Sequence, residues 1–301
     1  KSPIIGRVDP KMTEMKYEVP TSLDDAVALL ADGKGNAKVL AGGTDVLVQM
    51  HMDLIEPDLI VDIKNISELR EIAKEKDGYR FGAAVSGVEL MDHEDFCQTW
   101  PGVMDGVSLI GSLQVKGRAS VGGNVCNASP AADSVPAMIA AGATATIVGP
   151  KGKRDIPVEE IATGPGQTSL EDGEIVVSFF LPNAAPGTGG AYQRFTPRTE
   201  MDIAVVGVGI SLTLGDDGVC SSAKVALGAV ASTALIAEAA AAALVGTKVD
   251  EVALDNLAAA ASAACKPIDD KRGTKEYRIK VAGVLARRVA LIALERALGG
   301  K

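Results

Sequence analysis

Aromatic residues account for only 3% of this 301-residue chain, which has just two histidines, His51 and His93. So few histidines leave little material for a catalytic triad or a histidine metal site, and we predict that both are structural. The four cysteines lie far apart in the sequence: Cys97, Cys126, Cys220 and Cys265. Metal and iron–sulfur sites usually take two or more ligands from one tight turn. We therefore expect free thiols, no metal site and a reducing cytoplasmic environment.

Positive charge is also scarce, because 30 Lys and Arg residues face 39 Asp and Glu residues, for a net charge of −9. Nucleic acids and anionic membranes both select clustered positive charge, so neither is expected as the main partner. No apolar run reaches the roughly 18 residues that a membrane-spanning helix needs. The hydrophobic fraction of 47% is ordinary for a soluble globular protein, and the length allows two or three domains.

Glycine, by contrast, is plentiful, and the 33 glycines cluster in segments that suggest a close approach to another group. Residues 20–30 predict a helix that Thr21 caps and Gly33 ends. Residues 38–47 predict a buried strand, a tight glycine turn and the start of a second helix. Residues 57–63 predict another strand. The pattern indicates a small α/β lobe over residues 1–55.

The rest of the chain is predicted to form a second α/β lobe, residues 56–182, a Pro/Gly-rich linker, 183–190, and a C-terminal α+β domain, 191–301. In the second lobe, strands are expected at 79–83, 143–148 and 174–181, and helices at 88–96, 102–110 and 133–141. In the C-terminal domain, three strands at 191–195, 203–214 and 219–230 precede helices at 233–245, 250–264 and 274–298.

A first glycine loop follows the strand predicted near residue 38 and reads Ala-Gly-Gly-Thr-Asp over residues 41–45. Glycines allow positive φ and let backbone N–H groups converge on an anion. The Thr44 hydroxyl and the start of the following helix would add donors and a positive dipole end. By itself this is a weak motif, and an ordinary tight strand-to-helix turn would look much the same.

A second loop, residues 117–133, combines the Gly122-Gly123 step with small hydroxyl and amide side chains and a carboxylate, Asp133. This mixture suits a long polar ligand. Backbone amides would bind a pyrophosphate, Ser120 and Asn124 would bind phosphate or ribitol oxygens, and Asp133 would bind a hydroxyl. An ordinary polar loop remains possible on chemistry alone. Neither loop matches G-x-G-x-x-G or a P-loop, so a Rossmann fold and a P-loop NTPase are disfavoured.

At these residues the chain resembles the FAD-binding subunits of molybdenum hydroxylases, the family of the carbon monoxide dehydrogenase medium subunit and the flavin domain of xanthine dehydrogenase. The family motif A-G-G-T-D-L-L is similar to residues 41–47, and its I-G-S-x-Q…G-G-N-I-C-N-A-S-P-A-A-D segment is similar to residues 110–133. Two further motifs are similar to residues 173–178 and to residues 192–198 with Met201–Ala204. Lys116-Gly117 and Ala119-Ser120 depart from the usual R-N and G-T, but keep polarity and small size.

The resemblance implies a two-lobe FAD-binding fold of the PCMH-like type and a set of residues that contact FAD. From the first loop it implies Val39, Leu40, Ala41, Gly42, Gly43, Thr44, Asp45 and Val46. From the second loop it implies Ile110, Ser120, Val121, Gly122, Gly123, Asn124, Asn127 and Asp133, and from later segments Val176, Tyr192 and Arg194. Tyr192 would stack on the flavin or simply pack, and Arg194 would stabilise anionic reduced flavin. Arg198 and Asp202 are expected to form an ion pair or loop anchor, and Trp100 to be a packing anchor.

The same resemblance implies an oxidoreductase complex in which this chain has no catalytic acid, base or nucleophile. A large partner subunit would carry molybdenum–molybdopterin, and a small partner subunit would carry two 2Fe–2S clusters, as a dimer of heterotrimers. Electrons would pass through FAD to NAD, a quinone or oxygen. Two other readings stay open: a stand-alone flavin oxidase of the related two-lobe fold, and an assembly module that has lost its flavin.

Overall fold

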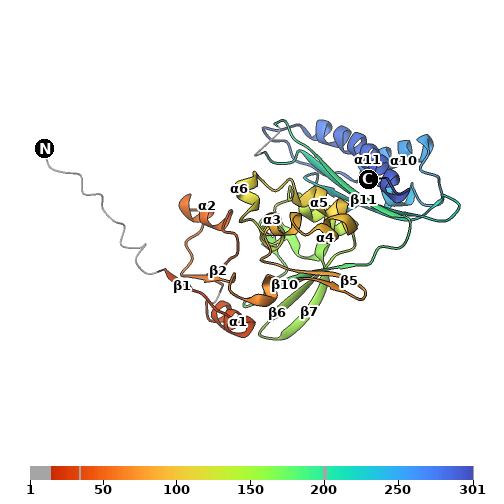
Figure 1. The fold of residues 1–301 in the computed structure, drawn as a ribbon. Coiled ribbons are helices and arrows are strands. Elements are labelled where there is room, and N and C mark those ends of the chain that lie inside the picture. The colour runs from red at the N-terminus through yellow and green to blue at the C-terminus, as the bar shows by residue number, and fades with distance from the viewer. Residues whose placement is uncertain (1–14, 34, 199–201, 301) are drawn as a thin grey trace.

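The computed structural model describes residues 15–33, 35–198 and 202–300, and Figure 1 shows how their elements are arranged. The first lobe is a parallel sheet of three short strands in the order β1 (Lys16–Glu18), β3 (Leu59–Asp62) and β2 (Ala37–Leu40). Because β3 pairs with both β1 and β2, the sheet extends to Asp62, beyond the lobe boundary predicted at residue 55. The predicted strand at 57–63 therefore belongs to the first lobe.

Helix α1 (Leu23–Asp32) of the first lobe begins one residue later than the predicted cap. Ser22, not Thr21, is the N-cap, because its hydroxyl accepts a hydrogen bond from the backbone N–H of Asp25 at 3.1 Å. Gly33 ends the helix as predicted. The second helix, α2 (Val46–His51), follows the first glycine loop and has no buried residue.

The second lobe is an antiparallel five-stranded sheet with strand order β4-β5-β10-β6-β7. Three strands lie where they were predicted: β5 (Gly78–Gly82), β6 (Thr144–Gly149) and β10 (Ile175–Pro182). The edge strands β4 (Ile72–Glu75) and β7 (Gly152–Pro157) were not predicted. Both are charged and largely solvent-facing, so they lack the apolar run by which the other strands were found. A small hairpin, β8 (Ala162–Gly164) and β9 (Gln167–Thr168), follows β7 in the chain.

Short helices occupy the remainder of this lobe. They are α3 (Gly87–Met91), α4 (Glu94–Thr99), α5 (Pro101–Val107), α6 (Leu113–Lys116), α7 (Val121–Cys126) and α8 (Ser134–Ala140), with 3-10 turns η2 (Ser67–Leu69) and η3 (Val158–Glu160). The single helix predicted over 88–96 is wrong, because the chain breaks there into α3 and α4. His93 starts α4 as its N-cap, and its Nδ1 accepts from the backbone N–H of Phe96 at 3.2 Å. This is the structural role expected of His93.

The C-terminal domain is an antiparallel sheet in the order β11 (Thr188–Phe195), β12 (Val206–Leu214), β13 (Cys220–Gly228) and β14 (Leu235–Ile236). Strand β11 starts inside the segment predicted as a linker. The helix predicted over 233–245 is largely wrong, because its first part is β14, a fourth strand that pairs with β13. Only α9 (Glu238–Ala242) is helical there, followed by α10 (Glu251–Ala264) and α11 (Lys275–Ala297).

The chain has two hydrophobic cores, one in the first and second lobes and one in the C-terminal domain. The sheet of the C-terminal domain packs against α11, and it also packs against α5 and α8 of the second lobe (Figure 1). Helices α5 and α8 therefore connect the two domains. The predicted fold class, a two-lobe α/β domain followed by an α+β domain, is confirmed.

Candidate functional site

A cavity of about 530 Å³ lies between the two lobes and brings both glycine loops together. Its walls contain fourteen of the nineteen residues predicted to contact the cofactor. These are Val39, Ala41, Gly42, Gly43, Thr44, Asp45, Val46, Ile110, Ser120, Gly122, Gly123, Asn124, Asn127 and Val176. Segments about 80 residues apart in the sequence thus form one polar site.

The first wall is the loop between β2 and α2. A Cβ on Gly42 would lie 2.0 Å from the carbonyl oxygen of Arg118, so only glycine allows the two loops to touch here. Gly43 has a φ of +78°, which side chains other than glycine rarely adopt. The chain turns at these two residues and enters α2 beside the cavity.

The second wall is α7 together with the residue that caps it. The Ser120 hydroxyl accepts from the backbone N–H of Gly123 at 3.0 Å, and Ser120 also forms a β-bridge with Ser86. A Cβ on Gly122 would lie 2.4 Å from the carbonyl oxygen of Ala83. At Gly123, by contrast, the nearest atom to such a Cβ is the Ser120 Oγ at 3.3 Å. Gly122 is therefore needed for packing, whereas Gly123 leaves its space to the cavity.

Side-chain hydrogen bonds connect the two walls. Gln49 of α2 donates to the amide oxygen of Asn127 at 3.2 Å, and the Asn127 amide nitrogen donates to the Asp45 carboxylate at 3.3 Å. Desolvation raises the pKa of Asp45 above its ordinary value. The Asn127 side chain thus connects the second wall to Asp45 and Gln49 of the first wall.

Five predicted residues lie outside the cavity lining. Leu40 and Val121 are buried beneath the loops. Asp133 accepts from the Tyr192 hydroxyl at 2.8 Å and from the Arg194 guanidinium at 2.5 Å. Burial raises the pKa of the Asp133 carboxyl, and the charge of Arg194 and the Tyr192 hydrogen bond oppose that rise. Both Asp133 oxygens are bound by residues of the C-terminal domain. This carboxylate therefore connects the start of α8 to β11 and does not line the cavity.

A second ion pair between the domains, Asp105–Arg296, was not predicted. Asp105 of α5 accepts from the Arg296 guanidinium at 2.6 and 3.1 Å and from the backbone N–H of Tyr192 at 3.1 Å. Arg296 also donates to the Gly190 carbonyl at 2.8 Å. Helix α11 thereby fixes the strand that carries Tyr192 and Arg194. No local motif predicts this contact, because Asp105 and Arg296 are 191 residues apart in the sequence.

Part of the cavity wall was also missed. It is the segment of the second lobe that leads into β10, and the residues concerned are Gly166, Leu170, Glu171, Asp172, Gly173, Glu174 and Ile175. Residues 173–178 were matched to a family motif, but only Val176 among them was predicted to contact the cofactor. Cys126 lines the cavity as well, and burial raises its pKa to about 12, so the thiol stays protonated. A covalent flavin link through a Cys126 thiolate is therefore disfavoured.

The donor set of this cavity fits FAD. Backbone N–H groups of the first glycine loop and the hydroxyls of Thr44 and Ser120 are donors suited to a diphosphate. Apolar side chains such as Ile110 and Val176 provide surface for ring systems. A Cβ at Gly123 would meet only the Ser120 hydroxyl, so a larger side chain would extend from there into the cavity.

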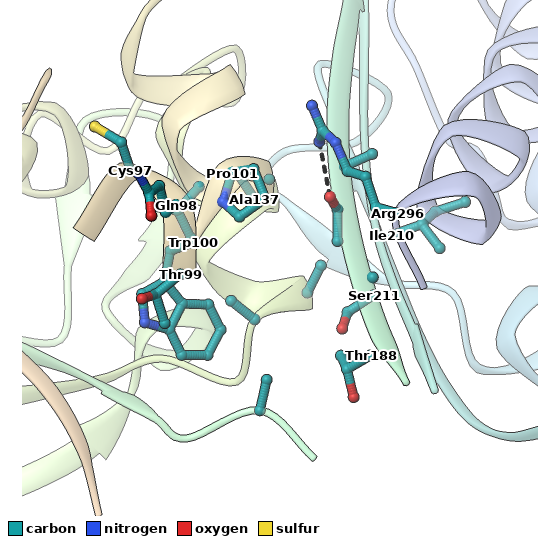
Figure 2. Close-up of a pocket in the computed structure, with 18 of the residues that line it drawn as sticks. Cys97, Gln98, Thr99, Trp100, Pro101, Ala137, Thr188, Ile210, Ser211 and Arg296 are labelled. Carbon is teal, nitrogen blue, oxygen red and sulfur yellow. Dashed lines mark hydrogen bonds between the residues drawn. The ribbon is translucent and has the colours of Figure 1, made fainter. Parts of the chain in front are cut away.

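A second cavity of about 570 Å³ lies between the domains, bordered by α4, α5, β11 and β12 (Figure 2). Trp100 and Arg296 lie on opposite sides of it. Trp100 is 8% exposed, which agrees with its predicted role as a packing anchor. Neither glycine loop reaches this cavity, so it is not the predicted cofactor site.

The predicted Arg198–Asp202 ion pair is present at 3.4 Å, and Met201 lies outside the described residues.

The fold and the inter-lobe cavity define the class of two-lobe proteins that bind a dinucleotide between glycine loops. Residues 13–184 match the family described as "FAD binding domain in molybdopterin dehydrogenase", and residues 191–293 match "CO dehydrogenase flavoprotein C-terminal domain". The chain is therefore an FAD-binding medium subunit of the molybdenum hydroxylase family, a flavoprotein subunit of a molybdopterin-dependent oxidoreductase complex.

Individual relatives agree along nearly the whole chain. The carbon monoxide dehydrogenase medium chain of Afipia carboxidovorans is 34% identical over 93% of this chain and 96% of its own length. The xanthine dehydrogenase FAD-binding subunit of Escherichia coli O157:H7 is 33% identical over 95% of this chain and 97% of its own. A crystal structure of Cu,Mo-CO dehydrogenase matches with a TM-score of 0.90 over 94% of this chain and 98% of the other, at 34% identity.

The described residues contain neither a candidate metal site nor a candidate membrane-spanning helix. Within them, no group of three or more His, Cys, Asp or Glu side chains is placed to hold a metal ion. In the same part of the chain, no helix is both long enough and apolar enough to cross a bilayer.

Proposed function

We propose that this chain transfers electrons within its complex, from 2Fe–2S clusters on a small partner subunit, through FAD, to NAD, a quinone or oxygen. The observation that carries the proposal is the single cavity built from both glycine loops. FAD, when bound, supplies the conversion between one-electron and two-electron chemistry. The large partner would carry the molybdenum–molybdopterin group, in a cytoplasmic dimer of heterotrimers. The matches to medium-chain and FAD-subunit relatives over nearly their full length support this division of labour.

The residues of this chain would bind and orient the cofactor and would not react with substrate. We assign the diphosphate to the backbone N–H groups around Gly42–Gly43 and to the Ser120 hydroxyl, and the polar ends to Thr44, Asn124 and Asn127. The cluster of Asp133, Tyr192 and Arg194 would hold the rear of the site rigid. The predicted domain division stands as a proposal with the first lobe extended to Asp62.

Purification of the intact complex tests this function. The expected result is one FAD per copy of this chain, by its visible absorption, together with two further chains that carry molybdenum and iron. Chain copies without flavin absorption would support the assembly-module alternative. A chain that purifies alone and oxidises a substrate at full rate would support the stand-alone oxidase and contradict the proposal.

Titration of the isolated chain with FAD tests the site itself. Gly123→Val would place a branched side chain in the open space of the cavity, so FAD affinity should fall by at least an order of magnitude. Unchanged affinity would exclude this cavity as the flavin site.

A further inference from the structure

The side chain of Asn124 lies in the wall of the inter-lobe cavity and has one end free. An amide presents an accepting oxygen at one end and a donating NH₂ at the other. The Asn124 oxygen accepts from the Ser134 hydroxyl at 2.7 Å. Within the described residues, the Asn124 NH₂ makes no hydrogen bond to protein. Whichever end faces the cavity therefore decides what the ligand meets there.

Ser134 determines that orientation because its own hydroxyl has no alternative acceptor. Ser134 is 0% exposed, and within the described residues the only hydrogen-bond partner of its side chain is Asn124. A buried hydroxyl proton without an acceptor is costly. If the amide were reversed, its NH₂ would meet the Ser134 oxygen, and the hydroxyl proton would be left unpaired. The Ser134 proton therefore points to the amide oxygen, and the NH₂ points to the cavity.

The position of Ser134 depends in turn on the C-terminal domain. Ser134 is the first residue of α8, in which every residue is buried. Asp133 precedes it, and its carboxylate is held by Tyr192 and Arg194 of β11. The backbone at the start of α8 is thus fixed from one side by β11, while the Ser134 hydroxyl reaches α7 on the other.

We propose that Ser134 is a positioning residue for the cofactor: it holds the Asn124 amide so that its NH₂ donates to an acceptor oxygen of bound FAD. This inference rests on the proposed binding of FAD in the inter-lobe cavity. A hydrogen bond of this kind changes affinity by about tenfold, because about 1.4 kcal/mol corresponds to a factor of ten in Kd. Without Ser134, no group of the described residues holds the amide oxygen away from the cavity, and the ligand loses a donor fixed in its direction.

The test measures FAD affinity by fluorescence titration of the full chain after removal of flavin. Ser134→Ala should raise the Kd by about tenfold. Thr146→Val is the control, because it removes a buried hydroxyl of the same lobe, bonded to Asp155 and Arg80, that does not line the cavity. The control should leave the Kd within twofold of that of the unaltered chain. If the unaltered chain itself binds no FAD, the proposed function fails first, and that result is distinct from a defect in Ser134→Ala alone.

A double-mutant cycle separates positioning from general destabilisation. Because Ser134 acts through Asn124, adding Ser134→Ala to Asn124→Ala should change the Kd by less than twofold. At saturating FAD, the visible circular dichroism of the flavin should differ from that of the unaltered chain in the same way for both single variants. Additive losses, or a Ser134→Ala variant that is folded and binds FAD with unchanged affinity, would overturn the proposal.

Discussion

The two walls of the inter-lobe cavity are built in opposite ways. In the second wall, Ser120 and Val121 are each 1% exposed, and α7 is capped, bridged to Ser86 and packed on the strand-end residue Ala83. In the first wall, α2 buries no residue, and Leu47 and Val48 are 51% and 52% exposed. One wall is part of a hydrophobic core, whereas the other is a surface segment tied to it by Gln49 and Asn127.

This difference indicates that the second wall is formed before the flavin binds, whereas the first wall is completed by the ligand. Local stability follows buried apolar contact, so α7 should open only with global unfolding, whereas α2 should open readily. A ligand that bridges the walls would supply the contacts that α2 lacks. Each of the following predictions would break or sharpen this contrast.

The largest expected effect is on stability, from a single methyl group at the packed glycine of the second wall. Gly122→Ala places a Cβ against the Ala83 carbonyl, which is backbone and cannot swing aside. We expect a loss of about 3 kcal/mol in the free energy of unfolding, measured by urea denaturation. Gly123→Ala is the matched control, which should cost much less, because its Cβ would meet only the Ser120 hydroxyl, at 3.3 Å, and no backbone atom. Equal losses at both positions would show that the second wall is not built on close packing.

The next effect comes from the helix cap of the second wall. Ser120→Ala removes the hydrogen bond to the Gly123 N–H, which should cost about 1 kcal/mol in stability. It also removes a hydroxyl from the cavity wall, so FAD affinity should fall as well, while Ser22→Ala, an N-cap outside the cavity, should affect stability alone. FAD titration and thermal unfolding of both variants check this. A Ser120→Ala variant with unchanged FAD affinity would remove Ser120 from the site.

Hydrogen exchange compares the two walls directly. Without FAD, amides of α2 should exchange much faster than those of α7, and FAD should slow α2 most. Gln49→Ala removes the bond to Asn127, so it should accelerate exchange in α2 with less than about 0.5 kcal/mol change in global stability. Equal protection of both helices in the flavin-free chain would contradict the contrast.

The smallest effect concerns charge in the first wall. Because desolvation raises the folded-state pKa of Asp45, its ionised form destabilises the folded chain at neutral pH. That penalty should disappear as pH falls through the raised folded pKa toward the ordinary value of 3.8. Asp45→Asn should therefore be more stable than the unaltered flavin-free chain at pH 7, with the gap closing in acid. A gap that widens in acid, measured by urea unfolding at several pH values, would contradict the assignment.

Much of the fold was predictable because its signals are local. Apolar runs located β5, β6 and β10, and long alternating or helical patterns located β12, β13, α10 and α11. Prediction failed where tertiary contacts override local propensity. The alanine-rich segment after residue 233 contains β14, because β13 offers it a strand edge to pair with. The charged strands β4 and β7 have no apolar signature, and pairing with inner strands determines them.

The two glycine loops, their chemistry and the family were readable from the chain itself, because backbone freedom and donor groups belong to particular residues. Whether a side chain faces the ligand was not readable, because it depends on partners brought in from distant segments. Asp133 was predicted to contact the ligand, and folding places Tyr192 and Arg194 on its two oxygens, which no local pattern indicates. Ser134 appeared to be an ordinary helix residue, but folding places its hydroxyl on Asn124. A hydrogen bond needs both partners at one point in space, and only the tertiary structure provides that.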